Sequence, residues 1–217
     1  YENDERSLID PLASLVREDA DEEVRAAAAT ALGRFALLGE TGELSASDIA
    51  RVDEALFAAI DDPEETLEVH RRALESIGVR SLERVVELIK VAYYSEEILL
   101  KYSALFAMGR HADPRWLPLL LLELKSSDAE ARYEAALACG EIEDETAVPH
   151  LVPLVGDDDI QVALAAIEAL GHIGGRLARQ TLRRASNNPD DRIASAAQDA
   201  LEEVGLGDDF TAFRLGD

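Results

Sequence analysis

The chain has 217 residues, of which 47% are hydrophobic and 30% charged, and its formal net charge at pH 7 is −24. The hydrophobic fraction favours a folded protein over a disordered one, and a negative field of this size argues against binding to nucleic acids or anionic membranes. No apolar run approaches the ~20 residues of a membrane-spanning helix.

The sequence contains a single cysteine, Cys139, which cannot form an internal disulfide. This is typical of a reducing compartment, so we expect a cytoplasmic protein. We expect no signal peptide at the start, and the first residue is Tyr1 rather than methionine. We therefore expect the sequence to be part of a longer protein.

A glycine returns along the chain at a fixed interval. Gly78, Gly109, Gly140 and Gly171 are spaced by 31 residues, and Gly33 precedes Gly78 by 45 residues. A fixed period of this size predicts stacked supersecondary units, here six helix pairs. In chain order the predicted units are residues 8–33, 50–78, 79–109, 113–140, 145–171 and 175–205, followed by a C-terminal cap or tail at 206–217, all in one domain over 1–217.

The second helix of each unit is predicted from residues that precede the glycine. Positions nine, five, two and one before it are small or aliphatic and fall on one side of a helix, including Val24 and Ala31 in the first unit. We expect the glycine itself to end the helix as its C′ residue. The position five before the glycine is always alanine, which predicts close helix crossing there: Ala28, Ala73, Ala104, Ala135, Ala166 and Ala197.

Acidic residues and prolines mark where helices begin. Pro11, Pro118 and Pro149 each lie 22 residues before a glycine and predict the first turn of a first helix. An acid lies twelve residues before the glycine position and predicts an N-cap at Asp21, Glu97, Asp128, Asp159 and Asp190. A base four residues further on is expected to pair with the acid on the same helix at Arg25, Lys101 and Arg132, with His70 in the second unit.

Two segments depart from the repeat. Extra residues around Leu37–Asp48 predict a longer connection in which residues 39–42 form a loop and Ser45 or Ser47 caps the next helix. Inserted loops often have binding roles, although a neutral insertion explains the segment equally well. In the tail, Phe210 and Phe213 are expected to fold back and cover the last helix pair.

The segment from Asp21 to Gly33 resembles the second helix of HEAT-like repeats, and the period of 31 resembles the short variety called PBS-lyase-like after the phycobilisome bilin lyases. Residues 128–140 and 157–171 match well, and the resemblance extends over residues 8–205. It implies an all-α fold, a right-handed α-solenoid of about six antiparallel helix pairs, with second helices on the concave face. It also implies a scaffold for protein partners.

The candidate binding residues come from the side of the second helices opposite the core. Positions seven and three before the glycine should be polar, as Arg71 and Glu75 are, but in three consecutive units they are mostly apolar. Apolar patches rimmed by charge are typical of interaction sites. Curvature that buries these residues between repeats explains them equally well. The predicted partner-binding residues are Leu99, Tyr102, Phe106, Tyr133, Leu137 and Leu164.

We expect no catalytic residue, metal or cofactor. HEAT-like deoxyhypusine hydroxylases hold iron with paired His-Glu dipeptides, and no histidine here precedes glutamate, so we do not expect that activity. His150 and His172 could approach each other, but a metal site needs more ligands. The run 157–159 is better explained by helix capping than by calcium.

The function predicted is therefore a non-catalytic scaffold or adaptor that binds a protein or peptide on its concave face, as a monomer or weak oligomer. The alternative is a bilin lyase-like enzyme or tetrapyrrole-binding protein, for which Arg71 and Arg72 could supply positive charge.

Overall fold

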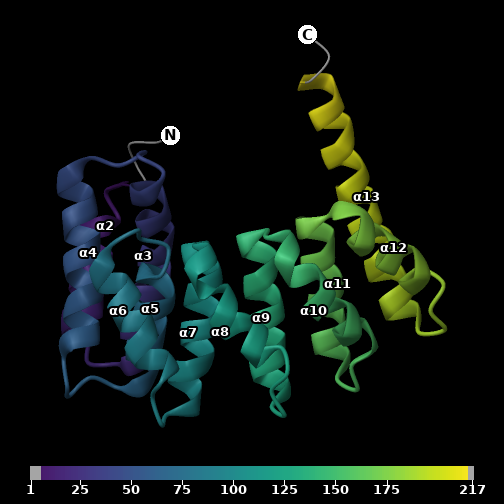
Figure 1. Cartoon of the computed structure of the whole chain (residues 1–217). Helices are drawn as coiled ribbons and strands as arrows, with labels where there is room; N and C mark the ends of the chain where they lie inside the picture. The colour runs from purple at the N-terminus through teal and green to yellow at the C-terminus, as the bar shows by residue number, and fades with distance from the viewer. Residues whose placement is uncertain (1–5, 215–217) are drawn as a thin grey trace. The chain divides into compact units, whose positions relative to one another are not determined.

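The computed structural model describes the backbone of residues 6–214 and the side chains of residues 6–202. Twelve α-helices, α2 to α13, and three short 3-10 helices lie in residues 6–214, and no strand occurs in that range (Figure 1). The chain divides into two compact units, Tyr1–His111 and Ala112–Asp217, which we call the N-terminal unit and the C-terminal unit. The prediction of a single domain over 1–217 is not tested by this division and stays a prediction.

Each unit contains three helix pairs, as the repeat predicts. The pairs of the N-terminal unit are α2 (Ile9–Glu18) with α3 (Glu22–Glu40), α4 (Ala46–Asp61) with α5 (Leu67–Ile77), and α6 (Glu83–Tyr93) with α7 (Ile98–His111). In the C-terminal unit, η1 (Pro114–Trp116) and α8 (Leu117–Glu123) pair with α9 (Ala129–Ile142), η2 (Glu145–Ala147), α10 (Val148–Leu151) and η3 (Val152–Gly156) pair with α11 (Ile160–Ile173), and α12 (Gly175–Ala185) pairs with α13 (Asp191–Arg214). The all-α solenoid of about six helix pairs is confirmed.

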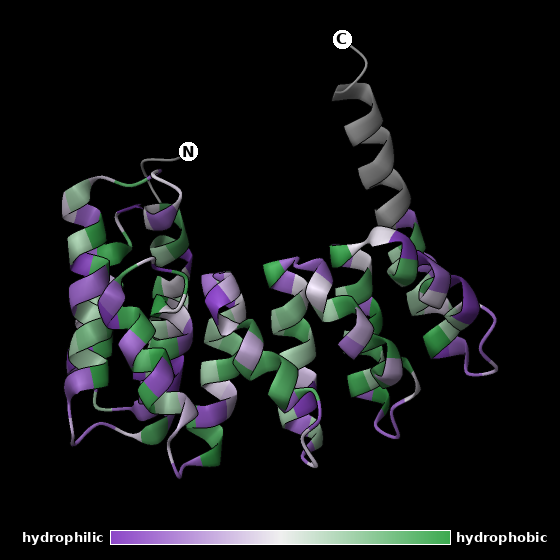
Figure 2. Cartoon of the chain, in the orientation of Figure 1, coloured by the Kyte–Doolittle hydropathy of each residue, from purple (hydrophilic) through white to green (hydrophobic). Residues whose placement is uncertain are grey.

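The core of each unit lies where small side chains meet. All six alanines five residues before the glycine position are buried, and α3 packs on α5, α5 on α7, α9 on α11 and α11 on α13. Two other positions that were predicted to face the core do not do so fully in the first pair: Val24 is half-buried and Ala31 is exposed. In Figure 2 hydrophobic residues run along the helices, and the turns that join them are mostly hydrophilic.

The repeated glycine does not end the helix, so that prediction is wrong for most units. Gly33, Gly109, Gly140 and Gly171 lie inside α3, α7, α9 and α11, and only Gly78 follows its helix directly. Glycine is needed because the next second helix approaches too closely for a side chain. A Cβ on Gly140 would lie 2.9 Å from Cα of Ala169, and one on Gly78 would lie 2.9 Å from Cβ of Ala107.

Two of the bases four residues after the acids, Arg25 and Arg132, pair with the neighbouring repeat and not along their own helix as predicted. The Arg25 guanidinium donates from Nη1 to the Asp19 carbonyl at 2.8 Å and binds both carboxylate oxygens of Glu65 at 2.8 and 2.9 Å. It thereby connects the turn between α2 and α3 to the turn between α4 and α5. Arg132 makes the same arrangement in the C-terminal unit, with the Ser126 carbonyl and the Asp157 carboxylate. These arginines clamp neighbouring repeats together.

Most of the predicted caps are confirmed. The side chains of Asp21, Asp128 and Asp159 accept hydrogen bonds from the backbone two residues later, and Asp190 does the same for Arg192. Ser45 caps α4, with its hydroxyl accepting from the Asp48 N–H. Other predicted start signals have the following outcomes: Pro11, Pro118 and Pro149 lie in first turns, whereas Glu97 does not cap α7 with its side chain and its own N–H donates to Ser95.

The extra residues near Leu37 mainly lengthen α3. The prediction of a loop over 39–42 is therefore wrong for residues 39 and 40, which are helical, and right for residues 41 and 42, which form a turn. Helix α3 has 19 residues and runs to Glu40, because Gly39 is buried close against Ile49. The buried Arg80 then binds this extension, with Nη1 2.8 Å from Glu40 and Nε 3.2 Å from Asp53 on α4. At the other end α13 continues to Arg214, and the side chains of Phe210 and Phe213 lie outside the described residues.

Candidate functional site

The candidate site is the side of the second helices that points away from the core, and we call it the second-helix face. It is made by the residues seven and three positions before each repeat-glycine position, which Glu202 occupies in the last unit, and by Leu99 nearby on α7. In the N-terminal unit these are Ala26 and Thr30 on α3, Arg71 and Glu75 on α5, and Tyr102 and Phe106 on α7, of which Ala26 is buried. In the C-terminal unit they are Tyr133 and Leu137 on α9, Leu164 and Glu168 on α11, and Ser195 and Asp199 on α13.

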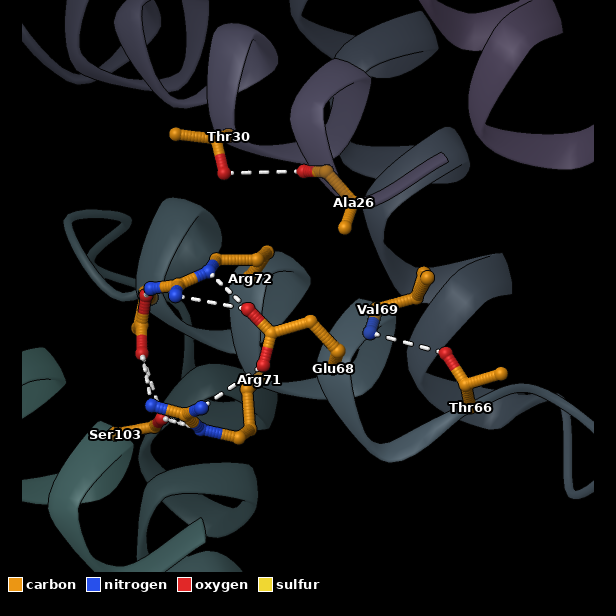
Figure 3. Close-up of polar contacts among 9 residues, drawn as sticks. Ala26, Thr30, Thr66, Glu68, Val69, Arg71, Arg72 and Ser103 are labelled. Carbon is orange, nitrogen blue, oxygen red and sulfur yellow. Dashed lines mark hydrogen bonds and ion pairs between the residues drawn. The ribbon is translucent and has the colours of Figure 1, made fainter. Parts of the chain in front are cut away.

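On α5 this face is polar, and its charges are already neutralised. Arg71 donates to Glu68 at 2.9 Å and to the Ser103 hydroxyl of α7 at 3.1 Å, and Ser103 in turn donates to Glu75 at 2.6 Å (Figure 3). Arg72 binds Glu68 and Glu75, each at 2.8 Å. Hydrogen bonding to Glu75 raises the pKa of Arg72. This network joins α5 to α7 and leaves little positive charge to attract an anion.

On α7 the same face is apolar and accessible. Phe106 is 41% exposed, Leu99 is 40% exposed, and Tyr102 is half-buried. Phe106 lies at a cavity of about 230 Å³ between the second helices of this unit. The other residues that line this cavity are Thr30, Gly33, Arg34, Glu75, Ser76 and Arg110.

Arg34 and Arg110 were missed by the sequence interpretation. Each directly follows a repeat glycine, and that position could have identified them, since Arg34 comes after Gly33 and Arg110 after Gly109. With Glu75 engaged by arginines of its own helix, the cavity beside Phe106 combines an aromatic ring with two guanidinium groups. Such a cavity can accept an aromatic side chain.

In the C-terminal unit the face is apolar in the middle and acidic at its edge. Tyr133, Leu137 and Leu164 are all half-buried. Burial raises the pKa of Tyr133, and the carboxylates of Glu134, Glu168 and Glu130 raise it further. A cavity of about 220 Å³ opens beside Tyr133. Its lining consists of Ala129, Glu130, Tyr133, Asp159, Gln161 and Val162.

The six predicted binding residues are therefore distributed over both units. None of them is fully buried, and Phe106 and Leu99 are the most accessible. The N-terminal unit contributes Leu99, Tyr102 and Phe106, and the C-terminal unit contributes Tyr133, Leu137 and Leu164. Their union in one continuous patch stays a prediction.

Candidate catalytic and metal-binding groups have structural roles. Burial raises the pKa of the Cys139 thiol to about 12, which disfavours the nucleophilic thiolate. Asp157 binds Arg132 and Asp159 caps α11. Within the described residues, no three His, Cys, Asp or Glu side chains are grouped so that they could hold a metal ion. The helices of the described part also lack the length and hydropathy needed to cross a membrane.

Comparison with protein families agrees with this architecture. The family model for HEAT repeats matches residues 85–162 and 117–202, and a single HEAT repeat matches residues 8–38. These matches include more than half of the chain, and the chain belongs to the HEAT repeat family. Comparison with curated proteins gives no match.

Solved structures with the same fold have low sequence identity. An engineered protein is 23% identical with a TM-score of 0.54, over 92% of this chain and 97% of its own. A designed armadillo repeat protein in complex with the peptide (KR)4 is 20% identical with a TM-score of 0.52, over 89% and 99%. Human deoxyhypusine hydroxylase is 20% identical with a TM-score of 0.50, over 91% and 74%. At this identity the likeness shows the fold alone. The repeat scaffold supports a protein-interaction role in general.

Proposed function

We propose that the chain is a non-catalytic adaptor that binds a protein or peptide partner on its second-helix face. The observation that carries this proposal is the exposure of Phe106 at a cavity on a face where α5 is polar and internally paired. The exposed part of this ring adds nothing to folding, whereas an aromatic anchor that a partner buries is a common source of binding energy. The half-buried Tyr133 beside its own cavity supports the same role in the C-terminal unit.

Charge supports a partner with basic residues for the C-terminal unit. The net charge is −24, and Glu130, Glu134 and Glu168 all act on Tyr133. A basic segment would be attracted to this acidic edge and would approach it faster at low salt. The designed armadillo repeat protein with a (KR)4 peptide illustrates this recognition on a related scaffold.

Bilin attachment or tetrapyrrole binding is supported less well. The cations suggested for the pigment's propionates, Arg71 and Arg72, are already bound to Glu68 and Glu75. Cys139 is buried and lines neither of the two cavities on the second-helix face. Pigment that copurifies with the protein would favour this alternative.

The proposal is tested by affinity capture from a lysate of the source organism with quantitative mass spectrometry. The bait is compared with a Tyr102→Ala, Phe106→Asp, Tyr133→Ala triple variant. The matched control is Leu122→Asp, because Leu122 is 62% exposed on the first helix α8 and lies outside the second-helix face. We expect the triple variant to lose a partner at least tenfold and the control to retain it. A partner retained by the triple variant, or lost equally by the control, would contradict the proposal.

A further inference from the structure

A cavity in the N-terminal unit lies away from the second-helix face. It has a volume of about 460 Å³, within the range of ligand pockets. Its lining is almost entirely apolar and comes from α4 to α7: Ile60, His70, Leu74, Leu88, Val91, Ala92, Tyr94, Ser95 and Leu100. None of these residues belongs to the second-helix face, so the cavity is a separate surface.

The cavity arises on one face of α6. Arg84 starts this face by pairing with Asp61 and lying 4.0 Å over the ring of Phe57, both on α4. Leu88 and Val91 follow on the same face, one and two turns later, and line the cavity opposite Ile60. The two first helices thus touch at Arg84, and beyond that contact the space between them is unfilled by side chains.

The open edge of the cavity exposes large apolar side chains. Val91 is 70% exposed and Tyr94 is 72% exposed, the two largest values among the exposed large hydrophobic residues of the described chain. At the base, Leu74 and Ala92 are buried. His70 is held by its Nε2 atom, 2.9 Å from the carbonyl oxygen of Asp62. A preformed apolar floor with exposed apolar walls is typical of a docking site.

The charges around this cavity are predominantly negative. Arg84 pairs with Asp61, Lys90 pairs with Glu87 at 2.8 Å, and the Lys101 ammonium lies 5.4 Å from the centroid of the Tyr93 ring. Four more carboxylates lie on the adjoining turns, and all of them are exposed: Asp62, Glu64, Glu96 and Glu97. The rim therefore favours a cationic occupant over an anionic one.

We infer that this cavity, which we call the α4–α6 groove, binds a short basic amphipathic helix of a partner protein. Large aliphatic or aromatic side chains of that helix fill the space over Leu74, between Ile60 and Val91. Its arginines or lysines face the carboxylates of the turns at residues 61–64 and 95–97. A helix in an apolar groove is a common mode of recognition, and its anchors recur at i, i+3 and i+4.

The test measures fluorescence anisotropy of a fluorescein-labelled 12-residue peptide with leucine and tryptophan on one helical face and arginine on the other. We expect Val91→Asp to weaken binding at least tenfold, although the added negative charge would strengthen a purely electrostatic attraction to the peptide. Leu122→Asp and Leu177→Asp add the same charge at exposed positions outside both proposed binding surfaces and should change the dissociation constant less than twofold. Circular dichroism verifies that each variant is folded.

Two further peptides separate the contributions of charge and apolar contact. One replaces leucine and tryptophan by serine and keeps the arginines, and the other replaces arginine by glutamate. Both should bind at least tenfold more weakly than the first peptide. Equal binding of either peptide, or a Val91→Asp variant that binds like the unmodified protein, would overturn the inference. A captured partner that is lost with the triple variant but retained by Val91→Asp concerns the second-helix face alone. The groove and the second-helix face can therefore be refuted separately.

Discussion

Both units stack their second helices through small residues and link neighbouring repeats by an arginine clamp, but they differ in the further contacts between helices and in the outward side of their second helices. In the N-terminal unit, charged side chains cross between helices: Arg80 reaches Glu40 and Asp53, and the α5 network reaches Ser103 on α7. In the C-terminal unit, α9 and α11 meet through small residues at Gly140 and Ala169. Their second-helix face is apolar, with Tyr133, Leu137 and Leu164.

This comparison distinguishes two sets of residues: those that form the repeat in both units, and those on the outward side of the second helices that differ between the units. The alanines and glycines recur in both units because they set the distance between second helices. The outward positions are not required for stacking, so α5 fills them with ion pairs and α9 fills them with apolar side chains. Where those positions are apolar and accessible, the scaffold gains a surface for a partner.

The largest expected effect is on the buried ion cluster of the N-terminal unit. Arg80→Met would leave Glu40 and Asp53 in a partly buried site without their cation, and should lower the free energy of unfolding by about 3 kcal/mol. Urea unfolding measures the loss, and hydrogen exchange should locate it in residues 6–111 rather than 112–202.

The matched rescue adds Glu40→Gln and Asp53→Asn to Arg80→Met. Because it removes the unpaired charges, it should recover at least half of the loss. A loss below about 0.5 kcal/mol in Arg80→Met would mean that solvent screens the cluster and that the contrast between the units is wrong.

A smaller effect is expected where helices approach most closely. Helix propensity alone predicts that Gly140→Ala stabilises the protein by about 1 kcal/mol. The Cβ would lie 2.9 Å from Cα of Ala169, so overpacking should outweigh this gain and give a net loss of about 1 kcal/mol.

The control for this prediction is Gly156→Ala, since no side chain or more distant backbone lies within 4 Å of its added Cβ. The control should be neutral or slightly stabilising in thermal unfolding. If Gly140→Ala proved as stable as Gly156→Ala, the glycine would have no packing role.

The arginine clamps should make stability depend on pH. Hydrogen bonding from Arg132 lowers the pKa of Asp157, and hydrogen bonding from Arg25 lowers that of Glu65. A lowered pKa means that the stabilisation is complete above the unfolded-state value of about 4 and is lost as the pH falls below it.

Asp157→Asn isolates one clamp, because its amide oxygen can still accept from the Asp159 N–H. We expect a loss of about 1 kcal/mol at pH 7 that shrinks towards zero near pH 2. Glu65→Gln should give the same pattern in the N-terminal unit. A difference that stays constant from pH 7 to pH 2 would exclude the ion pair as its cause.

Local patterns predicted the helix pairs and most of the caps. The period of 31 and the caps Asp21, Asp128 and Asp159 depend on residues close in sequence, so they could be interpreted without a structure. The role of Gly140 was misjudged because glycine is common after helices, whereas its contact with Ala169 is visible only once the helices are stacked.

Long-range polar contacts could not be predicted. Arg25 lies 40 residues from Glu65, so pairing along its own helix was the nearer expectation. Residues 39–42 have the composition of a loop, so the extension of α3 to Glu40 was not predicted. Packing of Gly39 against Ile49 outweighs the low helix propensity of this segment. The six candidate binding residues could be identified because they are apolar where polar residues are expected. The proximity of Arg34 and Arg110 became visible only in the structure, where both line one cavity.

The central claim is that a partner contacts the second-helix face, and site-specific photo-crosslinking tests it most directly. Benzoylphenylalanine is placed at Phe106 in one protein and at Leu122 in another, and each is irradiated in a lysate of the source organism. The account predicts one discrete crosslinked species from position 106 that the Tyr102→Ala, Tyr133→Ala background weakens, and none from position 122. Crosslinking from position 122 alone, or equal crosslinking from both positions, would contradict it.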